Sequence, residues 1–196
     1  MDVKINETKT DDNGRLLLLD VTIDDQNIIL LNVYAPTKDR PDQQMLFLDK
    51  MKQFIDDFLD RNILIGGDLN TYLDPKIDKT GGKEINEQSL FGKGIMLLCE
   101  EMNLIDIYRI LNPDKRRFSW RGVTRSGIVQ SRSDYWLVST HMLYDLIETN
   151  IKPSIRTDHS LITLSFNLTG TQKRGRGFWK FNTGLLNDKK IYKYHK

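Results

Sequence analysis

The chain has 196 residues, of which 39% are hydrophobic and 29% are charged, and its formal net charge is +2. This composition suits one globular domain and excludes a wholly disordered chain. The single cysteine, Cys99, excludes an internal disulfide and fits a reducing compartment. No apolar run approaches the length of a membrane helix, and the polar first 12 residues contain no secretory signal. An intracellular location, nuclear or cytoplasmic, is therefore expected.

The net charge conceals two regions of opposite sign. Residues 171–196 carry eight basic side chains and one acidic one, whereas residues 1–170 carry 21 basic and 26 acidic side chains. A basic tail on an acidic body indicates a polyanion partner. A solvated tail without a partner explains the same charges equally well.

The first half of the chain predicts an α/β arrangement. Residues Arg15–Ile23 and Ile28–Ala35 are rich in Leu, Ile and Val and predict two strands, joined by a hairpin turn at the polar residues 24–27. Apolar side chains at helical spacing predict an amphipathic helix over residues 42–60. A short buried strand, Asn62–Ile65, follows and stops at two glycines.

The second half continues the pattern. Residues 71–88 indicate a loop, and apolar spacing predicts a second helix over residues 89–102 in which Cys99 is a small buried hydrophobe. Four shorter segments come next: Leu104–Ile110 as a strand or a helical turn, and Phe118–Trp120, Asp134–Ser139 and Ser160–Leu168 as strands.

A carboxylate and an amide directly follow the buried strand of the first half. In Gly66-Gly67-Asp68-Leu69-Asn70, the glycines permit a sharp turn, and Asp68 and Asn70 point the same way in extended backbone. Sheets of α/β proteins bind ligands at this end of a strand. Asp68 could deprotonate a water and Asn70 could hold a phosphate oxygen. A glycine turn with an Asx cap is the structural alternative.

Three further motifs place polar side chains at strand ends. Asp158 is a hard oxygen ligand suited to Mg²⁺, and the adjacent His159 could donate a hydrogen bond to a phosphate. Asp134 heads an apolar strand and could orient a histidine, and Tyr34 could offer its hydroxyl to a phosphate. Taken singly, the Asp-His pair is more often an ordinary capped loop and Tyr34 a half-buried aromatic, and an edge charge is the alternative for Asp134.

A basic stretch runs from Arg109 to Arg132, with seven basic side chains against one acidic one. This composition, with an aromatic among the bases, is typical of a loop that binds nucleic acid. For Trp120 itself, a place in the core is the preferred interpretation, and a solvated loop is the alternative for the stretch. The predicted nucleic-acid contacts are Arg116, Arg117, Arg121, Arg125 and Arg132.

The order of the motifs NVYAP, GGDLN, SRSDYWLVS and TDHS is more specific than any one of them. It resembles the exonuclease–endonuclease–phosphatase superfamily, and within it the endonuclease domain of LINE-type (non-LTR) retrotransposons. The tail segment RGRGFWKFNTGLL resembles the region that leads to the reverse transcriptase in those elements. The resemblance implies a DNase I-like α/β fold, a four-layer sandwich of two mixed sheets flanked by helices.

The resemblance also implies a chemistry: nicking of one DNA strand with Mg²⁺ or Mn²⁺, to leave a 3′-hydroxyl. Tyr34 and Asn70 would contact the scissile phosphate, and Asp68 would position or deprotonate the attacking water. Asp158 would bind the metal. His159 would contact the phosphate while paired to Asp134. The implied partners are DNA and, in the full-length parent element, a reverse transcriptase domain.

The chain departs from the family at its start. It aligns from a point inside the family domain and has neither a W-N-x-N-G nor a Q-E motif, which carry the metal-site Asn and Glu. Residues 1–170 are thus expected to be a partial domain that lacks its first strand–helix segment, with impaired nicking and an open status as an enzyme. The alternatives are an inactive remnant that at most binds DNA, and a phosphoesterase acting on a small or lipid phosphate.

Overall fold

A six-stranded sheet forms the centre of the structure, a computed structural model that describes residues 2–82, 87–124, 127–154 and 156–167. Its strands lie in the order β1 (Val3–Thr10), β2 (Leu16–Ile23), β3 (Gln26–Tyr34), β4 (Asn62–Asp68), β9 (Asp134–Ser139) and β6 (Leu104–Asp106). The sheet is mixed, because β3 and β4 are parallel and all other neighbours are antiparallel.

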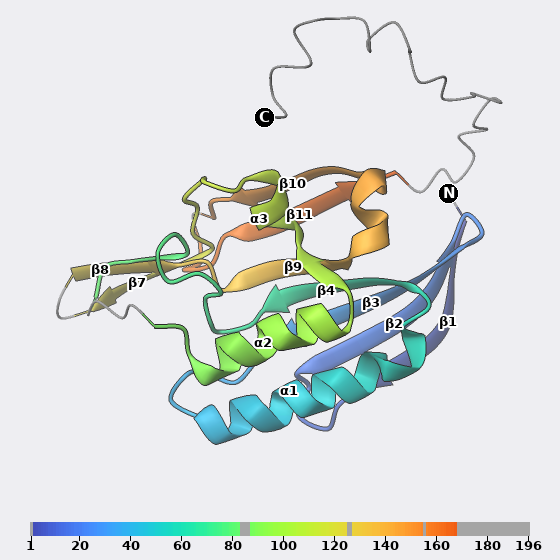
Figure 1. Ribbon diagram of the computed structural model, residues 1–196, viewed down its shortest axis with the longest axis horizontal. Coiled ribbons are helices and arrows are strands. Elements are labelled where there is room, and N and C mark those ends of the chain that lie inside the picture. The colour runs from blue at the N-terminus through green and yellow to red at the C-terminus, as the bar shows by residue number, and fades with distance from the viewer. Residues whose placement is uncertain (1, 83–86, 125–126, 155, 168–196) are drawn as a thin grey trace, which may run out of the picture.

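Two helices cover one face of this sheet, as Figure 1 shows. They are α1 (Pro41–Ile55), which a short 3₁₀ turn η1 (Asp56–Phe58) extends, and α2 (Leu90–Glu101). Alternate residues of the strands, such as Leu18, Ile29 and Ile65, pack against the helices in the larger hydrophobic core. Cys99 packs at the edge of this core, and burial raises the pKa of its thiol to about 12, as expected for a buried hydrophobe.

The opposite face carries the second, smaller core. Here Ile28, Leu64 and Val138 meet residues of a two-stranded antiparallel sheet. Its strands are β10 (Leu146–Lys152) and β11 (Leu161–Phe166), and the short α3 (Ile107–Leu111) and η2 (Thr140–Asp145) border it. The helices, the large sheet and the small sheet therefore form successive layers (Figure 1), which confirms the predicted α/β sandwich.

A third sheet projects from one end of the sandwich (Figure 1). It consists of β5 (Lys79–Thr80), β8 (Gly127–Ser131) and β7 (Trp120–Thr124), in that spatial order. An isolated bridge between Trp120 and His159 connects it to the segment that precedes β11.

Most predicted elements are confirmed, with some differences. The hairpin after β2 turns at Asp24 and Asp25, both at positive φ. The predicted loop over residues 71–88 contains β5, and Leu104–Ile110 is a strand followed by a helix. The strand predicted over Phe118–Trp120 begins only at Trp120 and continues to Thr124. The sequence did not predict β1, β8 or β10 as strands, and β1 is an exposed edge strand with polar residues on both faces. The basic tail 171–196 lies outside the described residues.

No helix in the described ranges has the length and apolar character needed to cross a membrane.

Candidate active site

Three predicted site residues lie in one row across neighbouring strands. Asp68, the last residue of β4, is paired with Tyr34 of β3 on one side and with Asp134 of β9 on the other. Because side chains alternate along a strand, all three share the face that carries Leu64 and Val138, the face of the small sheet. Tyr34 is 52% exposed at the rim, and Arg15 lies over its ring at 5.4 Å from the ring centroid.

Glycine permits the sharp end of β4. Gly67 has φ 140°, and a Cβ on it would lie 2.0 Å from the carbonyl oxygen of Val33. A Cβ on Gly66 would overlap the ring of Trp136. The Gly66-Gly67 pair thus allows β3 and β9 to approach β4 closely at the point where Asp68 begins the site.

The loop before β11 brings His159 to this row. Its Nδ1 lies 2.9 Å from Oδ2 of Asp134, and its Nε2 lies 4.0 Å from Oδ2 of Asp68. An ionised carboxylate only accepts hydrogen bonds, so Nδ1 carries the proton that Asp134 binds. The 4.0 Å distance is too long for a hydrogen bond, so Nε2 and the Asp68 carboxylate are neighbours without a direct bond, and one substrate oxygen could contact both only from the side of the line that joins them.

The charges of these groups are interdependent. Burial raises the pKa of Asp68 to about 6; the backbone N–H of Asn70 lowers it, the Asp134 carboxylate raises it, and His159 lowers it. Burial lowers the pKa of His159, but the neighbouring carboxylates, Asp134 foremost, outweigh burial and raise the pKa above its ordinary value. The site therefore holds a carboxylate whose pKa is raised to about 6 beside an imidazole whose protonated form the neighbouring carboxylates favour.

Asn70, two residues after Asp68, has its backbone in the left-handed region, at φ 49°. Its backbone N–H donates to Oδ1 of Asp68 at 2.8 Å, and its side-chain amide donates to the carbonyl oxygen of Ala35 at 2.8 Å. An amide NH₂ has two hydrogens, so the second can still be donated to a phosphate oxygen. The sequence offered an Asx turn and a candidate site as alternatives for Asp68 and Asn70. In the structure the two residues form the Asx turn and also lie in the candidate site.

Asp158 is exposed and lies next to the third sheet. Its Oδ2 accepts a hydrogen bond from Nε1 of Trp120 at 3.0 Å. Trp120 is only half-buried and lines two separate hollows, so its predicted place in the core is wrong. A place in the core was preferred because an aromatic flanked by Ser119 and Arg121 has the spacing of a buried strand residue.

The basic stretch divides into two groups. Arg132 is 1% exposed and binds Asp78 and Asp106 through paired hydrogen bonds, with its guanidinium 4.3 Å from the ring centroid of Tyr135. The prediction that Arg132 contacts DNA is therefore wrong, because its donors are consumed by a buried ion network.

The other basic residues of the stretch are placed differently. Arg117 and Arg121 are exposed, and Arg121 lines the same hollow as Asp158 and His159. Arg116 is also exposed, but it donates to the backbone carbonyl oxygens of Lys76 and Lys79 and so holds the loop before β5. Arg125 lies outside the described residues.

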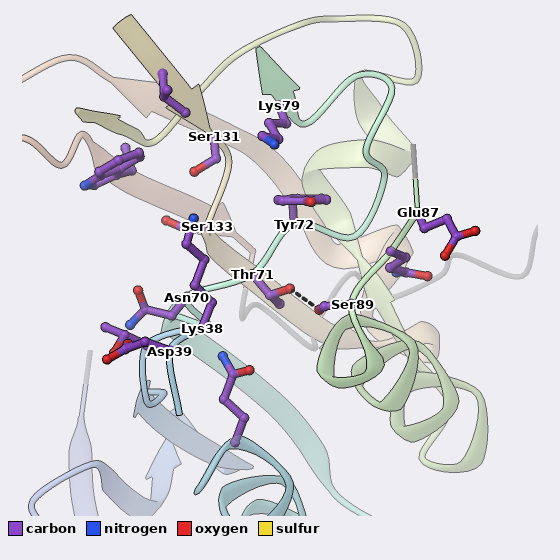
Figure 2. A pocket seen from close by; sticks show the side chains of 15 residues that line it. Lys38, Asp39, Asn70, Thr71, Tyr72, Lys79, Glu87, Ser89, Ser131 and Ser133 are labelled. Atoms are coloured by element: carbon purple, nitrogen blue, oxygen red, sulfur yellow. Dashed lines mark hydrogen bonds between the residues drawn. The ribbon is translucent and has the colours of Figure 1, made fainter. Parts of the chain in front are cut away.

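A cavity of about 540 Å³ adjoins the site between the β3–α1 loop, the segment after β4 and the third sheet. Asn70, Ser133 and Trp120 are among the residues that line it, and Figure 2 shows Tyr72 and Lys79 near each other on its wall. The Nζ of Lys79 lies 5.5 Å from the centroid of the Tyr72 ring. The volume and the aromatic walls are those of a small-molecule or nucleotide site.

The metal-binding capacity of the site is small. Within the ranges that the structure describes, no group of three or more His, Cys, Asp and Glu side chains could hold a metal ion. Among the predicted site aspartates, Asp68 and Asp134 face His159, and Asp158 is the exposed one. Mg²⁺ commonly binds through one or two protein carboxylates plus substrate phosphate oxygens, so Asp158 fits a metal that arrives with a phosphate.

The sequence of the chain is similar to that of a transposon protein. It is 29% identical over 177 residues to the transposon TX1 uncharacterized 149 kDa protein of Xenopus laevis. This alignment covers 89% of the chain but only 13% of the relative. No family model matches the chain.

The fold matches solved nucleases. The AP endonuclease LMAP of Leishmania major superimposes with a TM-score of 0.70 at 19% identity, over 82% of this chain and 57% of that one. An AP endonuclease from Archaeoglobus fulgidus (TM-score 0.64, 16% identity) and the 3′-5′ exonuclease NExo of Neisseria meningitidis (0.62, 18%) each align over 85% of this chain and 71% of theirs. The chain thus shares its fold with AP endonucleases and an exonuclease and is similar in sequence to a transposon protein, in agreement with the resemblance that its motifs predicted.

Proposed function

We propose that the chain is a DNA-nicking endonuclease domain of a retroelement, acting on phosphodiester bonds with Mg²⁺ or Mn²⁺. The observation that carries this proposal is the His159–Asp134 pair held 4.0 Å from Asp68 at the end of β4. It combines an oriented imidazole with a carboxylate whose pKa of about 6 suits a general base near neutral pH.

The side chains divide the work around the phosphate. Asp68 accepts a proton from the water whose oxygen bonds to phosphorus, and His159 donates a hydrogen bond from Nε2 to a phosphate oxygen while Asp134 keeps its ring oriented. The P–O3′ bond breaks, and the leaving 3′-oxygen takes a proton from solvent and becomes the 3′-hydroxyl. Asn70 and Tyr34 donate to other phosphate oxygens from the adjacent strand ends. Asp158 would hold the divalent cation together with a phosphate oxygen, and that cation would supply positive charge against the charge that develops on the phosphate.

The cavity beside Asn70 supports a nucleic-acid substrate. A nucleoside next to the scissile phosphate would lie between Tyr72 and Trp120, where aromatic rings can stack on a base. Arg117 and Arg121 would contact the DNA backbone nearby. In the full-length element, a reverse transcriptase domain would follow the basic tail, in keeping with the large size of the Xenopus relative.

A supercoiled-plasmid assay with Mg²⁺ or Mn²⁺ tests the proposal. The chain should convert supercoiled plasmid to open circles, and His159→Ala or Asp158→Ala should abolish the conversion. His141→Ala is the matched control, because His141 is exposed and its Nε2 contacts Asn62, away from the site. Nicking that survives His159→Ala would contradict the proposed site.

DNA binding without cleavage is the second candidate. The observation that favours it is that, of the three predicted site aspartates, only Asp158 is exposed, and that no group of three or more metal-ligating side chains occurs among the described residues. Weak nicking is accordingly expected. Folded chain that retains DNA in a fluorescence-anisotropy titration, but nicks with neither metal, would favour this candidate over the first.

A further inference from the structure

A buried serine lies where the third sheet, β9 and the loop of His159 meet. Ser119 is 0% exposed, although hydroxyl groups are usually found at the surface. Its Oγ accepts the backbone N–H groups of Ser133 at 3.0 Å and of Asp134 at 2.9 Å. A hydroxyl oxygen has two lone pairs, so one small side chain satisfies two adjacent buried donors.

The backbone of Ser119 forms hydrogen bonds to two further segments, the one that follows His159 and the end of β8. Its carbonyl oxygen accepts the N–H of Ser160 at 2.6 Å, and its own N–H donates to the carbonyl oxygen of Ser131 at 3.0 Å. One residue further on, Trp120 bridges to His159, and the N–H of Arg121 donates to the carbonyl oxygen of Asp158 at 2.9 Å. Residues 119–121 thus pair with residues 158–160 on one side, while Ser119 holds the start of β9 on the other.

We propose that Ser119 is a positioning residue that sets the distance between the Asp134 carboxylate and the His159 imidazole. The 2.9 Å contact of these side chains joins two segments that are 25 residues apart. Through its Oγ, Ser119 fixes the backbone of Asp134, and through its carbonyl oxygen it fixes the residue after His159. Ser119 does not touch the reacting atoms, and the proposal rests on the proposed function for its kinetic part only.

Removal of the hydroxyl has a defined consequence. The N–H groups of Ser133 and Asp134 would be left buried without an acceptor, so the start of β9 would shift or take up water. A displacement of about 1 Å in a catalytic group lowers turnover by about 100-fold. DNA affinity should hardly change, because the basic residues that contact the backbone do not depend on this hydroxyl.

The experiment compares Ser119→Ala and Ser119→Cys with Ser139→Ala in the full chain. Ser139 is a matched control at the other end of β9: it is buried, and its Oγ accepts the N–H of Ile63 at 2.9 Å. Ser119→Cys fills the volume with a weak acceptor, so it tests the hydrogen bonds even where Ser119→Ala fails to fold. The readouts are plasmid nicking at saturating DNA, DNA affinity, and the downfield NMR signal of the His159 Nδ1 proton, assigned by its loss in His159→Gln.

The proposal predicts that both Ser119 variants lose or shift the Nδ1 proton signal and nick about 10- to 100-fold more slowly, with DNA affinity within about twofold of the parent. Ser139→Ala should keep the signal and the rate. If a folded Ser119 variant retains both, as Ser139→Ala does, the proposal is overturned. Absence of nicking in the unmodified chain would contradict the proposed function instead, and the NMR signal alone would then decide the role of Ser119.

Discussion

At the scale of single residues, Asp68 illustrates a conflict between stability and function. Its folded-state pKa of about 6 lies above the ordinary value of 3.8, chiefly because it is buried. Between these two values the folded protein keeps a proton that the unfolded chain has lost. The free energy of unfolding attributable to Asp68 therefore falls as the pH rises through this window.

Asp68→Asn should consequently stabilise the protein at pH 7.5 by about 1 to 3 kcal/mol while abolishing nicking. The gain should shrink towards zero near pH 4, where the folded carboxyl is already neutral. Urea unfolding at both pH values measures it. Asp20→Asn is the contrasting control, because the Asp20 carboxylate binds Arg61 at 2.6 Å and its loss should destabilise. An equal gain at both pH values would show that the charge of Asp68 is not the cause.

The sequence predicted which candidate site residues lie together, but it did not predict the buried hydrogen bonds and ion pairs that hold them in place. Asp68, Asp134 and His159 were predictable because strand ends at one sheet edge converge. The burial of Arg132 was not, because its partner Asp78 lies 54 residues away and composition does not show pairing. For Ser119 there was no signal, since the role of a buried hydroxyl depends on backbone donors that only the fold brings together.

At the scale of elements, the turn between β1 and β2 depends on one carboxylate. Oδ1 of Asp11 accepts the N–H groups of Arg15 at 2.6 Å and Leu16 at 2.8 Å, and Oδ2 accepts that of Asn13 at 3.2 Å. Burial raises the pKa of Asp11, but these N–H groups, with Lys50, outweigh burial and lower it. The carboxylate thus holds in place the edge strand that the sequence did not predict.

Asp11→Ala should lower the free energy of unfolding by about 1 to 3 kcal/mol at pH 7, since three donors lose their acceptor. Because the pKa of Asp11 is lower in the folded state than in the unfolded state, its carboxylate stabilises the fold at pH values above the unfolded-state pKa. This stabilisation is lost as the pH falls through the folded-state pKa. The difference between variant and parent should therefore narrow below about pH 4. Urea titrations at pH 7 and pH 3 measure it, and a cost that does not depend on pH would assign the effect to packing alone.

The end of β4 offers a second test at this scale. Gly67→Ala places a Cβ against the Val33 carbonyl oxygen, 2.0 Å away, and also strains a backbone at φ 140°. Gly127→Ala is the matched control, because Gly127 has φ 111° but nothing lies within 4 Å of its Cβ position. The control should cost about 1 to 3 kcal/mol for strain alone, and Gly67→Ala should cost more and displace Asp68. Equal melting temperatures for the two variants would refute the close approach of β3 and β4.

At the scale of the whole molecule, the site lies where the three sheets meet. The large sheet supplies Tyr34, Asp68 and Asp134 in one row, the loop before the small sheet supplies Asp158 and His159, and the third sheet supplies Trp120. The twofold alternation along the strands directs the row towards the small sheet, away from α1 and α2. Under the proposed function, we expect a DNA duplex at the row to contact the third sheet and its exposed Arg121, which lines the same hollow as Asp158 and His159.

This placement predicts how DNA binding responds to salt. Arg117 and Arg121 are both exposed, and Arg121 shares a hollow with Asp158 and His159. Each phosphate contact releases condensed counterions, so Arg117→Ala with Arg121→Ala should weaken binding to all DNA sequences alike. The slope of log K against log salt should become shallower by about 2.

A matched control separates contact from net charge. Lys4→Ala with Lys93→Ala removes the same two positive charges from exposed positions on β1 and α2, away from the site. The control should lower the affinity slightly through the long-range field and leave the slope near that of the parent. Anisotropy titrations from about 50 to 200 mM salt cover the range in which such slopes are measured. If both double variants change the slope equally, the arginines act through net charge, and the DNA path past the third sheet is wrong.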